Sequence, residues 1–229
     1  MRKRKPGMES IVKSKKKPLA FFLAITPNLA FAAGNVALSL NKYMHGEDFE
    51  IVIYYSDLYD RDLDALQKIP NVKLFPFQLP EDFVTTMLAK IPSDSRFRDV
   101  NRLMCFAHFE IFPLLNTYQN VVWLDADIAI QANLKTITDF APFGITGDEP
   151  WTVQGNFTQP IEGYDMDLPG FCTAVIIVSD ALPYKAIYDW CYAAALKYAE
   201  YLINPDQAII NIMFQEFDFQ PNEMPHRIW

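Results

Sequence analysis

The chain has 229 residues, of which 51% are hydrophobic and 21% charged, a composition that excludes wholesale disorder and predicts one globular domain. No apolar run reaches the ~18 residues of a membrane span. The net charge is −8, yet residues 1–18 hold eight basic residues and one acid, leaving 12 basic against 27 acidic residues in the body, which disfavours nucleic acid as a partner.

The basic leader, residues 1–18, is predicted to be a solvated flexible tail. A peripheral contact with anionic lipid on the inner face of a membrane is an alternative. A signal peptide is another, with residues 19–25 as its apolar part, but Pro27 and Asn28 interrupt that stretch and favour a buried strand. Three cysteines in apolar surroundings predict free thiols and a reducing, cytoplasmic location.

After the leader, short apolar runs alternate with helical periodicity, which is typical of βαβ units and a mostly parallel sheet flanked by helices. We expect one α/β domain over residues 19–229. A helix over 57–69 is predicted to be capped by Ser56 or Asp57. The predicted strands are 19–25, 50–55, 72–77, 121–124, 151–154 and 171–179, and the other predicted helices are 30–43, 81–91, 95–115, 183–201 and 205–217.

The most informative stretch is a buried apolar strand that ends in two carboxylates, Asp125 and Asp127, with the small residue Ala126 between them. In open α/β sheets, ligands gather at the carboxyl ends of strands. Residues two apart in an extended segment point to the same side, so the two carboxylates repel each other unless a cation neutralises them. This D-x-D segment therefore predicts a site for a hard divalent cation that also holds phosphate oxygens.

Four segments together resemble family 8 glycosyltransferases, the group that includes glycogenin and bacterial lipopolysaccharide galactosyltransferases. The D-x-D segment is one, and the D-Q-x-x-[IL]-N motif, here Asp206 to Asn211, is another. The first strand with its following loop, and the stretch 170–178, match more loosely. The resemblance covers about residues 19–229.

The resemblance implies a single Rossmann-like domain of GT-A type, a nucleotide-sugar donor that is usually a UDP-sugar, and Mn²⁺ or Mg²⁺ held by Asp125 and Asp127. It implies transfer of a hexosyl group to a glycan or protein acceptor, with retention at the anomeric carbon. Asp206 and Gln207 would then be the catalytic residues, facing the sugar and the acceptor.

Several positions depart from the family pattern. In the first loop, where the family has an acid and a stacking Tyr, the chain has Thr26-Pro27 and Leu29, and only Asn28 keeps a familiar polar group. Thr26 and Asn28 remain the expected nucleotide contacts. Cys172 and Thr173 stand where the family has a sugar-binding amide. The resemblance places them beside the donor.

The resemblance also implies a basic side chain near the diphosphate of the donor, and three residues are candidates for it. His108 occupies the position where the family has Arg or Lys. Arg98 and Arg102, spaced four apart on the predicted helix 95–115, are the other candidates, since a guanidinium binds phosphate well. Each also has a structural interpretation: a core histidine, and a solvated helix face.

Towards the end of the chain, the family's C-terminal element with its third metal ligand is not recognised, and the resemblance implies a short form of the family. His226 is an alternative third ligand, although its neighbours match a different segment. Trp151 and Tyr164 are candidates for stacking on a sugar. A second D-x-D, Asp165 and Asp167, follows no apolar strand and is interpreted as a solvated loop or an acceptor contact.

Two other functions remain open at the level of the sequence. A metal-dependent nucleotidyltransferase would need a Gly-rich basic loop after the first strand, and residues 24–34 have none. A non-catalytic docking domain that keeps the fold is the other alternative, although the joint presence of the D-x-D and D-Q pairs argues against it.

Overall fold

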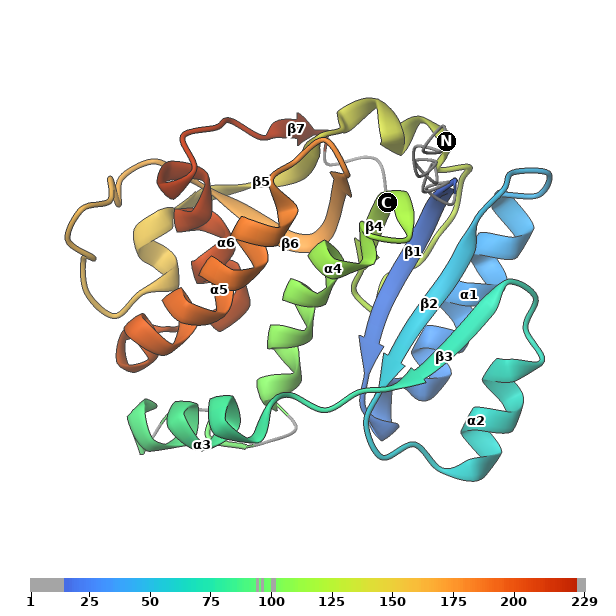
Figure 1. Cartoon of the computed structure of the whole chain (residues 1–229), viewed down its shortest axis with the longest axis horizontal. Coiled ribbons are helices and arrows are strands. Elements are labelled where there is room, and N and C mark those ends of the chain that lie inside the picture. Colours follow the sequence, from blue (N-terminus) through green and yellow to red (C-terminus); the bar gives the residue numbers. More distant parts are fainter. Residues whose placement is uncertain (1–14, 94, 96, 100–101, 226–229) are drawn as a thin grey trace, which may run out of the picture.

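A seven-stranded sheet forms the centre of the molecule (Figure 1). The computed structural model describes residues 15–93, 95, 97–99 and 102–225. The strand order is β3-β2-β1-β4-β6-β5-β7. The strands are β1 (Lys17–Ile25), β2 (Glu50–Tyr55), β3 (Val72–Pro76), β4 (Tyr118–Leu124), β5 (Phe143–Thr152), β6 (Pro169–Ser179) and β7 (Asn222–Met224).

The helices are α1 (Ala30–Tyr43), α2 (Asp60–Gln67), α3 (Glu81–Lys90), α4 (Ile111–Leu114), α5 (Tyr184–Tyr198) and α6 (Pro205–Glu216). Short 3₁₀ segments join them: η1 (Pro27–Leu29), η2 (Arg102–Glu110), η3 (Lys135–Phe140), η4 (Val153–Asn156) and η5 (Ala199–Tyr201). No helix within the described ranges is long and apolar enough to cross a membrane.

The first half of the chain builds the parallel part of the sheet. β1 pairs in parallel with β2 and β4, and β2 pairs in parallel with β3. β6 then enters antiparallel between β4 and β5, and β7 pairs in parallel with β5. The predicted α/β class, with a mostly parallel sheet flanked by helices, is confirmed.

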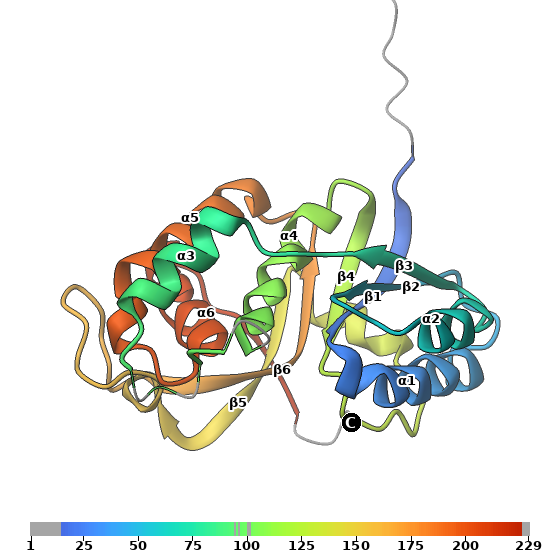
Figure 2. The ribbon, with the colours of Figure 1, turned by 90° about the horizontal axis from the view of Figure 1, so that it is seen from below.

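Two hydrophobic cores lie on opposite faces of this sheet. Along β1, Phe22 packs into one core while Phe21 and Leu23 pack into the other, because successive side chains of a strand alternate between faces. The same alternation holds for β4, where Trp123 and Val122 face opposite cores. Helices α1 and α2 cover one face, and α4, α5 and α6 cover the other (Figure 2).

Three predicted elements are wrong in their bounds. The helix expected over 57–69 begins at Asp60 after Tyr59, without a side-chain cap, and Asp57 has a left-handed backbone with φ of 55°. In place of one helix over 95–115, the chain forms the 3₁₀ segment η2 and the short α4. The strand expected over 151–154 is the end of a longer strand, β5, followed by η4.

Other expectations at the ends of the chain are largely outside the described residues. Residues 1–14 of the leader lie outside the described residues, and contact of the leader with a membrane stays a prediction. The first strand begins at Lys17, two residues before the expected start of the domain. His226 also lies outside the described residues. All three cysteines are free thiols, as predicted.

Candidate active site

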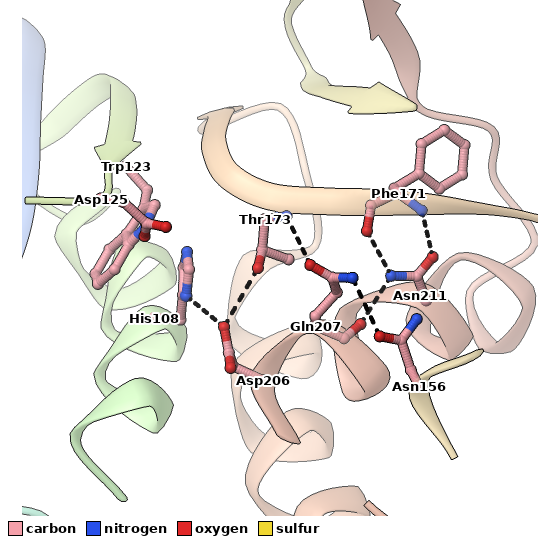
Figure 3. A network of polar contacts seen from close by, with 9 residues as sticks. All are labelled: His108, Trp123, Asp125, Asn156, Phe171, Thr173, Asp206, Gln207 and Asn211. Atoms are coloured by element: carbon pink, nitrogen blue, oxygen red, sulfur yellow. Dashed lines mark hydrogen bonds and ion pairs between the residues drawn. The ribbon is translucent and has the colours of Figure 1, made fainter. Parts of the chain in front are cut away.

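The two carboxylate motifs meet at the carboxyl edge of the sheet. β4 ends at Leu124, so Asp125 follows directly, and its amide donates to the carbonyl of Ala174 on the neighbouring β6 at 2.9 Å. α6 begins at Pro205, so Asp206 and Gln207 lie in its first turn. This end of the helix is the one nearest the carboxyl edge of the sheet. The segment η2 approaches from the other side and carries His108 (Figure 3).

His108 connects the two motifs. Its Nδ1 lies 2.7 Å from Oδ2 of Asp206, and both side chains are largely buried, at 4% and 14% exposure. The imidazole packs against the indole of Trp123, with ring centroids 3.6 Å apart. Since an ionised carboxylate only accepts hydrogen bonds, Nδ1 is the donor. Thr173 donates to the same Oδ2 at 3.3 Å, so Asp206 is held from two sides.

Asp125 lies on the other side of the imidazole (Figure 3). Trp123 donates from Nε1 to Oδ1 of Asp125 at 2.9 Å. Burial raises the pKa of Asp125 to about 6; His108 and the Trp123 bond work against this rise, while the charges of Asp206 and Asp127 add to it. Asp125 is thus a largely desolvated carboxylate whose ionised form is only partly stabilised by its neighbours.

This donor set fits a divalent cation in part. Asp125 and the exposed Asp127 supply the hard oxygen ligands that Mn²⁺ and Mg²⁺ take, and a cation would stabilise the buried ionised carboxylate. No group of three or more His, Cys, Asp or Glu side chains in the described part of the chain could hold a metal. The remaining ligands would therefore be phosphate oxygens and water.

Gln207 has its side chain locked by three hydrogen bonds. Its Oε1 accepts from the amide of Thr173 at 3.3 Å, and its Nε2 donates to Oδ2 of Asp148 at 3.0 Å and to Oδ1 of Asn156 at 3.1 Å. Asn211, one turn further along α6, accepts from the amide of Phe171 at 2.7 Å and donates to its carbonyl at 2.9 Å. α6 is therefore fixed against β6 through side chains.

Sequence reasoning missed three contributors to this site. Asp148 lies outside the strand predicted over 151–154, whereas β5 begins at Phe143 and includes it. Asn156 was not singled out, although it lies 2% exposed between Gln207 and Asn204. Trp123 belongs to the apolar strand before the D-x-D and carries no motif of its own. Its indole does pack in the core, and its N–H also serves Asp125.

The other predicted residues fall into two groups. Thr26 and Asn28 lie in the loop after β1, where the Thr26 hydroxyl donates to Oδ1 of Asn28 at 2.6 Å. Cys172 and Thr173 lie on β6 next to the carboxylates. Burial raises the pKa of the Cys172 thiol, and the charges of Asp148, Asp125 and Asp206 raise it further, so the protonated thiol is favoured.

Arg98 and Arg102 do not share a helical face. Only Arg102 belongs to a helical segment, since η2 begins there, and both side chains are exposed. Neither guanidinium forms an ion pair with a carboxylate within the residues that the structure describes. The expectation of a shared helical face is wrong, because a turn closed by the bond from the Arg98 amide to the Ser95 carbonyl precedes η2. That either arginine supplies the cation for the diphosphate stays a prediction.

More than half of the chain, residues 20–144, matches the model of glycosyl transferase family 8. The chain belongs to this family. The match includes the first loop, His108, the D-x-D segment and the start of β5. The chain is thus a glycosyltransferase with a GT-A fold, as the resemblance implied. No curated protein sequence matches it.

Solved structures of glycosyltransferases share the fold. The galactosyltransferase LgtC in complex with donor and acceptor sugar analogs superposes with a TM-score of 0.63 at 15% identity, over 85% of this chain and 70% of that one. Mouse xyloside xylosyltransferase 1 superposes with a TM-score of 0.53 at 14% identity, over 90% of this chain and 85% of that one. The bifunctional glycosyltransferase WbbM superposes with a TM-score of 0.59 at 13% identity. The superposition covers 88% of this chain but only 38% of WbbM.

Proposed function

We propose that this glycosyltransferase transfers a hexosyl group from a nucleotide sugar to a hydroxyl of a glycan, with a UDP-sugar as the first candidate donor. Asp125 and Asp127 would hold Mn²⁺ or Mg²⁺, and Asp206 and Gln207 would act at the sugar. Retention of the anomeric configuration is part of the proposal and rests on membership of the family.

The observation that carries the proposal is the continuous set of contacts between the two motifs. From Asp125 it runs through Trp123 and the imidazole of His108 to Asp206. Such a network would hold the groups proposed to contact the diphosphate and the groups proposed to contact the sugar in one fixed arrangement. When bound, a divalent cation supplies Lewis-acid stabilisation of the diphosphate leaving group.

The residues of α6 would act on the sugar. Asp206, held by His108 and Thr173, would accept a hydrogen bond from a sugar hydroxyl or stabilise positive charge at the anomeric carbon. Both N–H bonds of the Gln207 amide are engaged, while Oε1 accepts one bond and keeps a second lone pair. That oxygen would face the reacting sugar in a fixed direction.

A cavity of about 400 Å³ next to Gln207 supports a glycan as the acceptor. Asp148 and Asn156, which both bind the Gln207 amide, line this cavity together with Trp151, which is 63% exposed. An exposed indole beside carboxylate and amide groups suits a sugar, which has an apolar face and hydroxyl edges. Tyr164, the other aromatic candidate, instead donates to Glu216 at 2.7 Å and packs on Tyr198.

The proposal is tested by thermal shift with UDP-, GDP-, CMP- and dTDP-sugars, each with and without Mn²⁺. A ligand at 100 times its Kd stabilises the native state by about 2.7 kcal/mol. We expect stabilisation that needs both one nucleotide sugar and Mn²⁺, that is absent from Asp127→Asn, and that is kept in Asp167→Asn. Asp167 is an exposed aspartate of the second D-x-D and serves as the matched control. Equal stabilisation with and without Mn²⁺, in both variants, would contradict the metal role.

A further inference from the structure

Two cavities lie side by side where β2 and β3 end. Their volumes are about 330 and 470 Å³, and Ser56, Asp57 and Gln78 line both. β1, β2 and β3 end at the same edge of the sheet (Figure 1). The amide of Ser56 donates to the carbonyl of Ile25 at 3.1 Å, so this pair of cavities adjoins the loop that carries Thr26.

The lining of these cavities suits a neutral ligand with hydroxyl groups. It offers the carboxylate of Asp57, the amide of Gln78 and the aromatic rings of Tyr55 and Phe77. Neither cavity has a Lys or Arg among the described residues that line it, so a phosphate would meet only negative and neutral groups there. A ribose and a base are better matched, because a carboxylate can accept hydrogen bonds from two hydroxyls and aromatic rings can pack on a base.

The position along the sheet edge also fits a nucleoside. β1 separates β2 from β4, and adjacent strands are about 4.8 Å apart, so Asp57 follows a strand roughly 10 Å from the one that ends at Asp125. That is the scale of an extended nucleotide. A diphosphate near Asp125 and Asp127 would place its nucleoside over the ends of β1 and β2.

The loop after β1 does not provide an acid for the ribose. Thr26 is buried and bonded to Asn28, and Pro27 and Leu29 carry no polar side chain. Asp57 is exposed, and its carboxylate accepts one bond, from the Ser56 hydroxyl at 3.2 Å. An acid after the second strand of a βαβ unit is the group that binds ribose hydroxyls in dinucleotide-binding folds.

We infer that Asp57 binds the ribose hydroxyls of the donor nucleotide, and that Gln78 contacts its base. This inference rests on the proposed function, which supplies the nucleotide. It assigns recognition of the nucleoside to the ends of β2 and β3, beyond the loop after β1.

The test compares ribonucleoside diphosphates with their 2′-deoxy counterparts. Dissociation constants for UDP, GDP, CDP and ADP and for the four 2′-deoxy forms are measured with Mn²⁺ by titration calorimetry, on the full chain. Asp57→Gly removes the carboxylate and keeps the left-handed backbone, since glycine adopts positive φ without strain. Asp218→Gly is the matched control, because Asp218 is an exposed aspartate with φ of 49° outside both cavities.

We expect the native chain and Asp218→Gly to bind the preferred ribonucleotide about 10-fold or more tightly than its 2′-deoxy form. In Asp57→Gly that ratio falls towards one, because the lost group is the one that reads the hydroxyl. If the native chain binds a nucleotide and Asp57→Gly keeps both its affinity and the ratio, the assignment of Asp57 is wrong while the proposed function stands. If no nucleotide binds the native chain with Mn²⁺, the proposed function fails and the nucleoside site fails with it.

Discussion

The two ends of the candidate site differ in how firmly their side chains are held. At the end formed by β4, β6 and α6, the carboxylate of Asp206 and the amide of Gln207 each take part in two or more hydrogen bonds. At the end formed by β2 and β3, Asp57 and Gln78 are exposed. The difference indicates that the proposed reacting end is organised before a substrate binds, whereas the proposed nucleoside end leaves its polar groups free for a ligand.

This comparison separates the expected effects of substitutions. Changes at the organised end should lower the rate of transfer or the stability of the fold, because a network loses a member. Changes at the open end should lower affinity for the nucleotide and leave stability unchanged.

Among substitutions in α6, the largest effect on turnover is expected for Gln207→Ala. The variant removes the oxygen proposed to face the sugar, and we expect the turnover number for hydrolysis of the donor sugar to fall about 100-fold. The Michaelis constant should change less than about threefold, since the nucleotide is held elsewhere. Gln67→Ala, an exposed glutamine of α2, is the control and should keep the native rate. A rise in the Michaelis constant with an unchanged turnover number would place Gln207 in ground-state binding.

Asn211→Ala should give the largest loss of stability. Asn211 is 2% exposed and bonds both backbone groups of Phe171, so its removal takes a hydrogen-bond partner from a part-buried amide and a part-buried carbonyl. We expect the free energy of unfolding to fall by about 2 kcal/mol, measured by urea denaturation. Asn116→Ala, at an exposed site, is the control, and it should lower the free energy of unfolding by less than about 0.5 kcal/mol. Equal losses in the two variants would contradict a role for Asn211 in fixing α6.

An intermediate effect is expected from Trp123→Phe, measured as a shift in the pH dependence of activity. The proposed cation binding needs ionised Asp125, so activity at limiting Mn²⁺ should fall as the pH drops through about 6, the pKa of the free carboxyl. The Trp123 N–H bond lowers the pKa of Asp125, so its loss raises that pKa and moves the acid limb of the profile to higher pH. Trp190→Phe, on α5, should leave the limb in place. An unmoved limb in Trp123→Phe would show that another group titrates there.

The smallest effect is expected away from the site, at Glu110. Burial raises the pKa of Glu110, although Tyr192 and Tyr188 donate hydrogen bonds to it. The folded state therefore favours the protonated form, and stability should fall as the pH rises from below the ordinary Glu range through the raised pKa. Glu110→Gln removes this dependence. Melting temperatures from pH 4 to pH 8 should show a flatter slope for the variant, and parallel curves would contradict the account.

Parts of the first half of the fold are predictable from the sequence. α1 and β2 have the bounds that periodicity predicts, because each buries a regular set of apolar residues on one side or both. β5 is different. It contains Pro150, Gly144 and Gly147, which weaken any strand pattern, and its pairing with β6 has two register shifts. Sequence reasoning therefore placed the strand too late in the chain.

The site is predictable only in its motifs. The D-x-D and D-Q segments are local patterns, and the fold brings them to one edge. His108 and Asp206, which form a hydrogen bond, are 98 positions apart in the sequence. His108 lies on the 3₁₀ segment η2, where the periodicity of the sequence predicts part of one long α-helix. Asp148 and Asn156 carry no motif, and only the tertiary contacts with Gln207 identify them.

The central claim is that Asp125 and Asp127 support metal-dependent cleavage of a nucleotide sugar. The most direct measurement is release of nucleotide from UDP-glucose, UDP-galactose and UDP-N-acetylglucosamine, with Mn²⁺ or with a chelator, by the native chain and by Asp127→Asn. We expect release from at least one donor, lost with the chelator and reduced at least 100-fold in the variant. Release that proceeds equally with the chelator and in Asp127→Asn would contradict the claim.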